Sequence, residues 1–235
     1  MKALLFDVDD TLYDRSTPFK KAYEELYKGK YEVKARDLYL AVTRRGEEVF
    51  GAAQRGEMAL EASHIYRVKN GFADMGIDIS EEEALCFQKN YAGKQGEIQM
   101  SDPVKRMLDH CKNHGFRMGI VTNGPAEHQW RKVQKLGLTN WIPKEHVVVS
   151  GECGMAKPDV RIFEYAVQKM DLKNMEIWYV GDSYKNDICG AAAAGWKTVW
   201  LNKDKKELGK DMVHPDMMVY DEEELADSIE RLSRV

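Results

Sequence analysis

The spacing of apolar residues divides the chain into two kinds of segment. Residues 2–9 form a short apolar run without helical period that ends in acidic residues, as expected for a buried strand of a parallel sheet. From about residue 16 to residue 92, apolar residues recur three and four positions apart, and Ser80 with Glu83 forms a capping-box pattern. This stretch predicts about four helices without an intervening strand. They are expected around 18–27, over 35–54 and 58–74, and from residue 80 onward.

After about residue 100, predicted helices and strands alternate. Asp102 and Pro103 suit the start of a helix that Gly115 ends, and a buried strand over 116–122 follows. Repeated strand–helix units with short connections predict an α/β fold with a doubly wound parallel sheet and helices on both faces. The further strands are expected over 146–149, 177–180, 198–201 and 217–220, and the further helices over 125–136, 159–170, 186–194 and from 222.

Length and composition agree with two domains. A chain of 235 residues fits one α/β core with a small accessory domain. We therefore expect a Rossmann-like core of residues 1–15 and 98–235, with a helical bundle inserted at residues 16–97. The hydrophobic fraction of 43% argues against disorder, and the net charge of −4 gives no basic field for a nucleic-acid polymer or an anionic membrane. An anionic substrate would need a local positive site.

Cysteine usage and hydropathy bear on the compartment. The four cysteines lie far apart and form no CxxC pair, which favours reduced thiols in a cytoplasmic protein. The apolar runs never reach the roughly 18 consecutive residues of a membrane span, so neither a signal peptide nor a transmembrane helix is predicted.

Polar side chains follow the predicted core strands, directly at the strand end or, for Lys157 and Asp187, several residues beyond it. Open α/β sheets bind ligands outside the carboxyl ends of their strands, so we expect these side chains to converge on one site. Taken singly, most of them have an ordinary explanation, because Asp-x-Asp after a strand is a common turn and a lone lysine is usually solvated. In chain order the residues are Asp7, Asp9, Thr122, Asn123, Lys157, Asp182 and Asp187.

The residue types at these positions suit phosphoryl transfer. That reaction needs an in-line nucleophile, neutralisation of charge on the phosphoryl oxygens and protonation of the leaving alkoxide. Asp7 could attack phosphorus and form a covalent intermediate, with Asp9 acting first as acid and then as base. Thr122 and Lys157 would bind the phosphoryl oxygens, and Asn123 is expected to contact the substrate.

An all-oxygen site is also predicted. Asp7 and Asp182, with Asp187 as a further candidate, are hard ligands that suit Mg²⁺ better than zinc or copper. The ion and Lys157 together would offset the repulsion between these acids and an incoming phosphate dianion. The Gly124–Pro125 step should begin a helix whose free N–H groups point at the anion.

Four segments resemble, in order and spacing, the motifs of the haloacid dehalogenase superfamily. The helical insert resembles the helical-bundle (C1-type) cap of that family, so the resemblance covers nearly the whole chain. The stretch 122–129 is similar to the pyrimidine 5'-nucleotidase-like branch. The segments are Asp7-Val-Asp9-Asp10-Thr11, Val121-Thr122-Asn123-Gly124, Lys157-Pro158 and Gly181-Asp182-Ser183-Tyr184-Lys185-Asn186-Asp187.

The resemblance implies roles for the individual residues. Asp7 would be the nucleophile and Asp9 the general acid and base, with Thr122 and Lys157 binding phosphate. Mg²⁺ would be held by Asp7, the backbone carbonyl of Asp9 and Asp182. Asp187 would be a supporting residue beside the metal ligands.

The function expected from these observations is a Mg²⁺-dependent phosphatase that forms an aspartyl-phosphate on Asp7. Its substrate would be a small phosphorylated metabolite, either a nucleoside 5'-monophosphate or a sugar phosphate. The alternatives are a phosphomutase or dehalogenase on the same fold, or a non-catalytic phospho-acceptor or binding module. Asp9 argues against a dehalogenase, because halide departs without a proton. A receiver-type phospho-acceptor would be about half this length and has no use for a helical insert.

Overall fold

A computed structural model describes residues 2–233, which form two compact units. The first, called the sheet unit, contains the described residues up to Asp14 and from Gln99 onward. The second, called the helical unit, is Arg15–Ile98. Each unit has its own hydrophobic core.

The sheet unit is built on six parallel strands in the order β3-β2-β1-β4-β5-β6. β1 lies near the centre, between β2 and β4, and its residues Ala3 to Phe6 are fully buried. This order is that of a doubly wound sheet, and the predicted α/β fold class is confirmed. The strands are β1 (Lys2–Phe6), β2 (Arg117–Thr122), β3 (Val147–Val149), β4 (Glu176–Gly181), β5 (Lys197–Leu201) and β6 (Met217–Val219).

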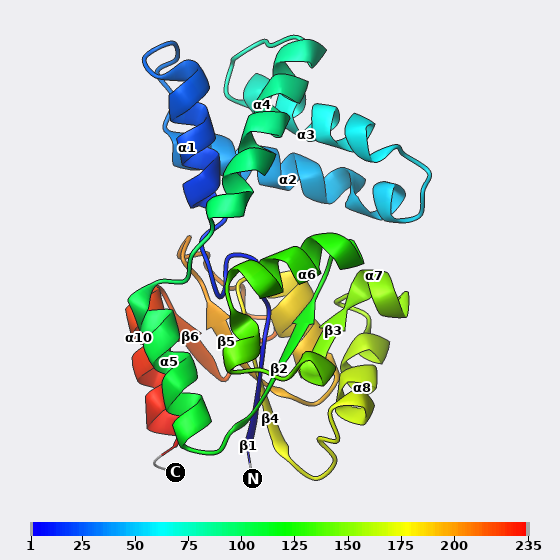
Figure 1. The fold of residues 1–235 in the computed structure, drawn as a ribbon, viewed down its shortest axis with the longest axis vertical. Coiled ribbons are helices and arrows are strands. Elements are labelled where there is room, and N and C mark those ends of the chain that lie inside the picture. The colour runs from blue at the N-terminus through cyan, green and yellow to red at the C-terminus, as the bar shows by residue number, and fades with distance from the viewer. Residues whose placement is uncertain (1, 234–235) are drawn as a thin grey trace. The chain divides into compact units, whose positions relative to one another are not determined.

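Helices cover both faces of this sheet (Figure 1). On one face, α8 and α9 pack on β-strand side chains such as Leu5, Val121 and Tyr179. Elsewhere α5 and α10 pack against each other, and α5 buries Val104 and Cys111 as its sequence pattern predicts. The helices of this unit are α5 (Asp102–Asn113), α6 (Ala126–Lys135), α7 (Ser150–Cys153), α8 (Val160–Lys169), α9 (Gly190–Ala193) and α10 (Glu222–Leu232).

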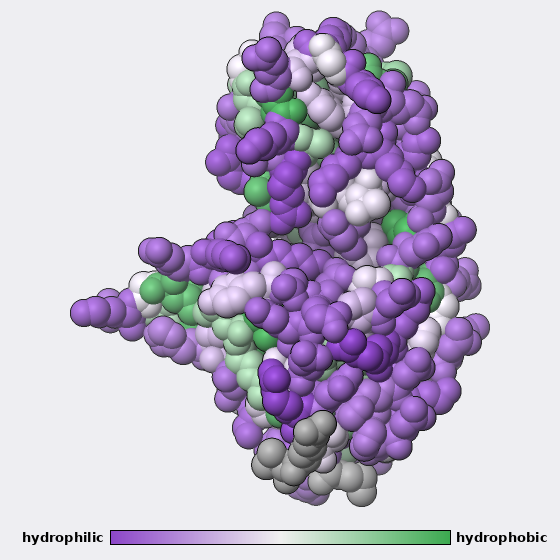
Figure 2. Space-filling view, turned by 90° about the vertical axis from the view of Figure 1, so that its left-hand side faces the viewer, coloured by the Kyte–Doolittle hydropathy of each residue, from purple (hydrophilic) through white to green (hydrophobic). Residues whose placement is uncertain are grey.

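The outer surface over α5 and α10 is polar. Figure 2 shows this side of the sheet unit as mostly hydrophilic. Arg106 of α5 makes ion pairs with Glu223, Asp227 and Glu230 of α10 at 2.8–3.1 Å. Within residues 2–233, no helix combines the length and apolar character that a bilayer-crossing segment requires.

The predicted helix over 186–194 differs from the observed structure. A π-helical segment, Tyr184–Cys189, comes first and is followed by the short α9. The Ile188 N–H donates to the Ser183 carbonyl, five residues back, and the Ser183 N–H donates to Asp187 Oδ2 at 2.9 Å. The wider turn directs the Asp187 carboxylate to the end of β4. π-Helical turns often occur at functional sites.

The helical unit contains the four predicted helices. Their shared core is rich in aromatic rings: Phe87 contacts Phe19, Tyr27 and Phe72 with ring centroids 4.9–6.1 Å apart. The predicted capping box at the start of the fourth helix is present with both of its hydrogen bonds. The helices are α1 (Ser16–Tyr27), α2 (Ala35–Gln54), α3 (Leu60–Asp74) and α4 (Glu81–Lys94).

Candidate active site

Asp7 is the first residue after β1 and lies at the carboxyl end of the sheet. Its N–H donates to the Val180 carbonyl at 2.9 Å, so the backbone is still held by β4 at this point. The chain turns soon afterwards, and Asp10 has a left-handed conformation with φ of 60°. The side chain of Asp7 is buried. The sheet therefore fixes the position of this carboxylate.

Lys157 connects two of the acids. Its Nζ donates to Asp7 Oδ1 and Asp187 Oδ1, both at 2.7 Å, and to the Tyr179 hydroxyl at 2.9 Å. The Tyr179 hydroxyl in turn donates to the Val121 carbonyl at 2.6 Å. All three protons of the ammonium group are used, so its position is fully determined. Burial acts to lower the pKa of Lys157, but Asp187 and Asp7 outweigh it and keep this pKa well above its usual value.

The pKa of Asp7 is raised although its carboxylate contacts the Lys157 ammonium group. Burial raises the pKa of Asp7 from 3.8 to about 6; the Lys157 ammonium opposes this shift, and Asp187 and Asp9 add to it. Of the two Asp7 oxygens, Lys157 donates to Oδ1 alone. Among residues 2–233, no side chain donates a hydrogen bond to Oδ2. The site could accept a further cation, and Oδ2 is available to a reaction partner.

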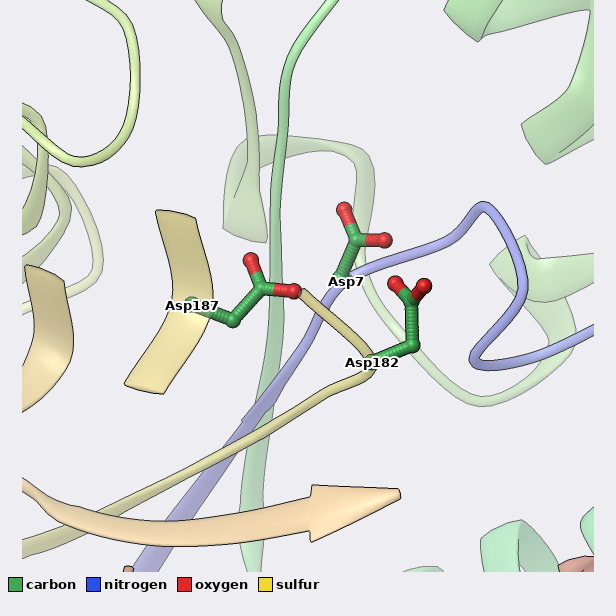
Figure 3. A group of neighbouring side chains, drawn as sticks. All are labelled: Asp7, Asp182 and Asp187. Atoms are coloured by element: carbon green, nitrogen blue, oxygen red, sulfur yellow. The ribbon is translucent and has the colours of Figure 1, made fainter. Parts of the chain in front are cut away.

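The carboxylates of Asp7, Asp182 and Asp187 form a cluster (Figure 3). Each offers one oxygen, and these atoms lie within 4.8 Å of one another. An all-carboxylate set fits a hard divalent cation such as Mg²⁺. Asp187 already accepts bonds from Lys157 on Oδ1 and from the Ser183 N–H on Oδ2. This agrees better with a supporting role for Asp187 than with direct ligation.

Thr122 and Asn123 end β2 beside this cluster. Thr122 is fully buried, and among the described residues its Oγ1 has no hydrogen-bond partner. A buried hydroxyl without a partner is costly, so a ligand oxygen at this position would satisfy it. Asn123 is engaged elsewhere: Nδ2 donates to the Lys157 carbonyl and Oδ1 accepts the Lys157 N–H, both at 2.9 Å. Asn123 thus holds the backbone of Lys157, and its contact with substrate stays a prediction.

Asp9 has partners that sequence reasoning missed. The Nζ of Lys132 donates to both of its oxygens at 2.7 and 2.6 Å, and Gln129 Nε2 donates to Oδ2 at 3.1 Å. The Tyr13 hydroxyl donates to Oδ1 at 2.5 Å. The only sequence signal was the spacing of Gln129 and Lys132, which places them on one side of a helix. That spacing alone does not identify their partner.

The helix after β2 begins at Ala126, one residue from its predicted start, and Gly124 lies before it. The N–H of Gly124 is not free, because it donates to Ser150 Oγ at 2.9 Å. Ser150 begins α7, a short helix that the sequence pattern did not predict. Gly124 has a φ of 149°, and a Cβ there would lie 2.5 Å from Gln129 Nε2. Glycine is therefore required for both its conformation and the room it leaves to Gln129.

The geometry suits attack by the Asp7 carboxylate on the electrophilic centre of an anionic group. A buried ammonium group, an unpartnered hydroxyl and a cation-binding cluster lie around Asp7. A second carboxylate, Asp9, lies two residues on and is held by its own donors.

Comparisons with known proteins identify one family of hydrolases and several relatives. The model of the haloacid dehalogenase-like hydrolase family matches residues 1–195. A relative named glyceraldehyde 3-phosphate phosphatase from Methanothermobacter thermautotrophicus is 31% identical over 91% of this chain and 91% of its own length. A relative of the same name from Methanopyrus kandleri is 29% identical over 100% of this chain and 99% of its own.

A solved structure has the same fold. The HAD-hydrolase YfnB of Bacillus subtilis, whose crystal form is described as bound to magnesium, aligns with a TM-score of 0.71 at 22% identity. The alignment covers 100% of this chain and 99% of YfnB.

Proposed function

The chain belongs to the haloacid dehalogenase-like hydrolases, and on this premise we propose that it is a Mg²⁺-dependent phosphatase acting on a small sugar phosphate. The observation that carries the proposal is the buried Lys157 ammonium, which bonds at 2.7 Å to both Asp7 and Asp187 at the carboxyl end of the sheet. This contact orients one carboxylate as a nucleophile and places positive charge where a phosphoryl group would arrive.

In the first step, Asp7 Oδ2 attacks phosphorus and the bond from phosphorus to the substrate oxygen breaks. Lys157 holds Oδ1, so the attacking oxygen needs no reorientation. The Thr122 hydroxyl donates to a phosphoryl oxygen, which would satisfy its unpartnered Oγ1. Asp9 donates a proton to the leaving oxygen, and the alcohol departs.

In the second step, Asp9 takes a proton from water. The water oxygen attacks phosphorus, the bond between phosphorus and Asp7 breaks, and inorganic phosphate leaves. Asp7 is regenerated as a carboxylate, and Asp9 holds the proton needed for the next cycle. The two steps together consume one water molecule per phosphate monoester.

The metal ion would be held by Asp7, Asp182 and the backbone carbonyl of Asp9, with Asp187 beside them. When bound, Mg²⁺ neutralises charge on the phosphoryl oxygens and between the carboxylates. Support for this set comes from the carboxylate cluster of Asp7, Asp182 and Asp187.

We further propose that the helical unit, assigned from the sequence as residues 16–97, acts as a cap on a core of residues 1–15 and 98–235. A cap of this kind selects the substrate and controls the access of water between the two steps. The names of the two relatives favour a triose phosphate, and the similarity of 122–129 to nucleotidases keeps nucleoside 5'-monophosphates as candidates. We expect the enzyme to act in the cytoplasm, in keeping with the scattered cysteines.

A substrate panel tests the proposal. Phosphate release is measured with Mg²⁺ from glyceraldehyde 3-phosphate, ribose 5-phosphate, phosphoglycolate, UMP and AMP, and halide release from 2-chloropropionate. We expect phosphate release from a sugar phosphate, and a loss of at least about 10³-fold in Asp7→Asn. Wild-type turnover by Asp7→Asn would overturn the role of Asp7. Halide release without phosphate release would identify a dehalogenase, and phosphate exchange within one sugar a mutase.

A further inference from the structure

The carboxylate of Asp9 is held by three side chains. Oδ1 accepts from Tyr13 and Lys132, and Oδ2 accepts from Lys132 and Gln129, at distances of 2.5–3.1 Å. An ionised carboxylate has about four lone-pair positions, and these four bonds engage both of its oxygens. Both torsions of the Asp9 side chain are therefore fixed by contacts on two sides.

Two of the three donors come from α6, the helix that directly follows β2. Gln129 and Lys132 are three residues apart and lie on the same side of α6. Gln129 Nε2 also donates to the Asn123 carbonyl at 2.9 Å, which ties it to the end of β2. Gly124 leaves the space that Gln129 occupies. Gln129 thus links the residue after β2 to Asp9 through two hydrogen bonds.

Burial makes the Lys132 contact more than a surface ion pair. The side chain of Lys132 is 8% exposed and that of Asp9 is 13% exposed. Removing two charges from water has a large desolvation cost that a simple structural link would not require. Apolar side chains at both positions would connect α6 to the loop that carries Asp9 at least as well. A structural link alone therefore does not explain why the pair is charged.

We propose that Lys132, together with Gln129, is a positioning residue that holds Asp9 in reach of the leaving-group oxygen. This inference rests on the proposed phosphatase function, in which Asp9 is the general acid and base. A general acid must lie within hydrogen-bond distance of the oxygen that it protonates, and small displacements cost much of its effect.

The test compares two leaving groups. The alkoxide of a sugar phosphate needs a proton to depart, whereas p-nitrophenolate departs without one. The parameter is kcat/KM, because it reports the steps up to transfer of the phosphoryl group to Asp7 and excludes its later hydrolysis. We expect Lys132→Met to lower kcat/KM about 10²-fold for the sugar phosphate and by less than about threefold for p-nitrophenyl phosphate.

Two comparisons separate positioning from a general loss of structure. Lys135→Met removes an exposed lysine one turn along α6 and should leave kcat/KM for both substrates unchanged. In an Asp9→Asn background, Lys132→Met should add nothing further for the sugar phosphate, since a positioning residue acts only through the group it holds. Gln129→Leu should show the same dependence on leaving group with a smaller loss, and it serves as the test if Lys132→Met does not fold.

The outcomes are distinct. Equal losses on both substrates, or an undiminished effect of Lys132→Met in the Asp9→Asn background, would overturn the positioning role. So would an unchanged kcat/KM for the sugar phosphate in Lys132→Met. If the wild-type enzyme hydrolyses neither substrate, the proposed function fails, which is recognisable before any variant is made.

Discussion

At the scale of single residues, the site depends on the balance of charge around Asp7. Lys157 is one cation shared by Asp7 and Asp187, and Asp182 adds a third carboxylate to the cluster. Burial is the main cause that raises the pKa of Asp7 to about 6, while Lys157 opposes the shift and Asp187 and Asp9 add to it. Lys157 alone does not neutralise the site, which is the physical reason to expect a divalent cation there.

The raised pKa predicts how Mg²⁺ binding depends on pH. Below about 6, Asp7 carries a proton in the metal-free protein, and the metal must displace it. Affinity should therefore rise by nearly tenfold per pH unit between about pH 4.5 and 6 and level off above about pH 7. Titration calorimetry in two buffers of different ionisation enthalpy should detect close to one proton released per Mg²⁺ near pH 5.

The comparison variant for this prediction is Asp7→Asn. It has no titrating group at this position, so its weaker Mg²⁺ binding should lose most of its pH dependence over the same range. Binding to the wild-type protein that is independent of pH between 5 and 7 would contradict the electrostatic account of Asp7.

At the scale of elements, close packing in the helical unit depends on a glycine. A Cβ at Gly71 of α3 would lie 2.5–2.8 Å from atoms of Val42 on α2, including backbone atoms that cannot move away alone. The two helices approach each other closely only because this position lacks a side chain. Gly93 of α4 is the opposite case. A Cβ added there would have no heavy atom of the described residues within 4 Å.

These two glycines predict stability changes of opposite sign. Gly71→Ala should lower the free energy of unfolding of the helical unit by about 1–3 kcal/mol, because the clash with α2 exceeds the gain in helix propensity. Gly93→Ala should raise it by up to about 1 kcal/mol. Urea denaturation followed by far-UV circular dichroism measures both. A stabilising Gly71→Ala would show that α2 and α3 are packed less tightly than described.

The elements also show what can be predicted from sequence. The helix α2, which has a helical period, and the strand β2, which is a continuous apolar run, were predicted within about two residues. Local pattern did not predict the π-helical turn at Tyr184–Cys189, which includes Asp187, a residue paired with a lysine 30 residues away in sequence. The short α7 likewise offers too few residues for a period.

The same limit applies to the site. The order of polar residues at strand ends indicated that Asp7 and Lys157 converge, because topology alone brings carboxyl ends of parallel strands together. Topology does not specify hydrogen bonds. The engagement of Asn123 with the Lys157 backbone and of Lys132 with Asp9 depends on side chains 34 and 123 residues apart in sequence.

At the scale of the whole molecule, the two units have separate cores and separate optical probes. All five tryptophans lie between residues 130 and 200, within the sheet unit, so their fluorescence reports on that unit alone. The helical unit has an aromatic core around Phe87, which is fully buried. Domains with their own cores commonly unfold in separate transitions.

We therefore predict two unfolding transitions. Phe87→Ala removes a central ring and should destabilise the helical unit by about 3–5 kcal/mol. The midpoint of the helical unit's transition, followed by circular dichroism, should therefore fall. Tryptophan fluorescence should keep its midpoint in this variant. Mg²⁺ bound at the proposed site should instead raise the fluorescence midpoint, since a ligand that binds only the folded sheet unit stabilises that unit. A single transition, coincident in both signals and shifted by Phe87→Ala as a whole, would contradict independent cores.

The central claim is that Asp7 forms a covalent phosphoryl intermediate. The most direct test mixes the Asp9→Asn variant with Mg²⁺ and p-nitrophenyl phosphate, quenches with acid and locates the phosphoryl group by peptide mass spectrometry. Transfer to Asp7 needs no acid with this leaving group, while its hydrolysis lacks the base, so the intermediate should accumulate. The account predicts phosphate on Asp7 alone. Release of p-nitrophenolate with no phosphorylated peptide, or with phosphate on another residue, would contradict it.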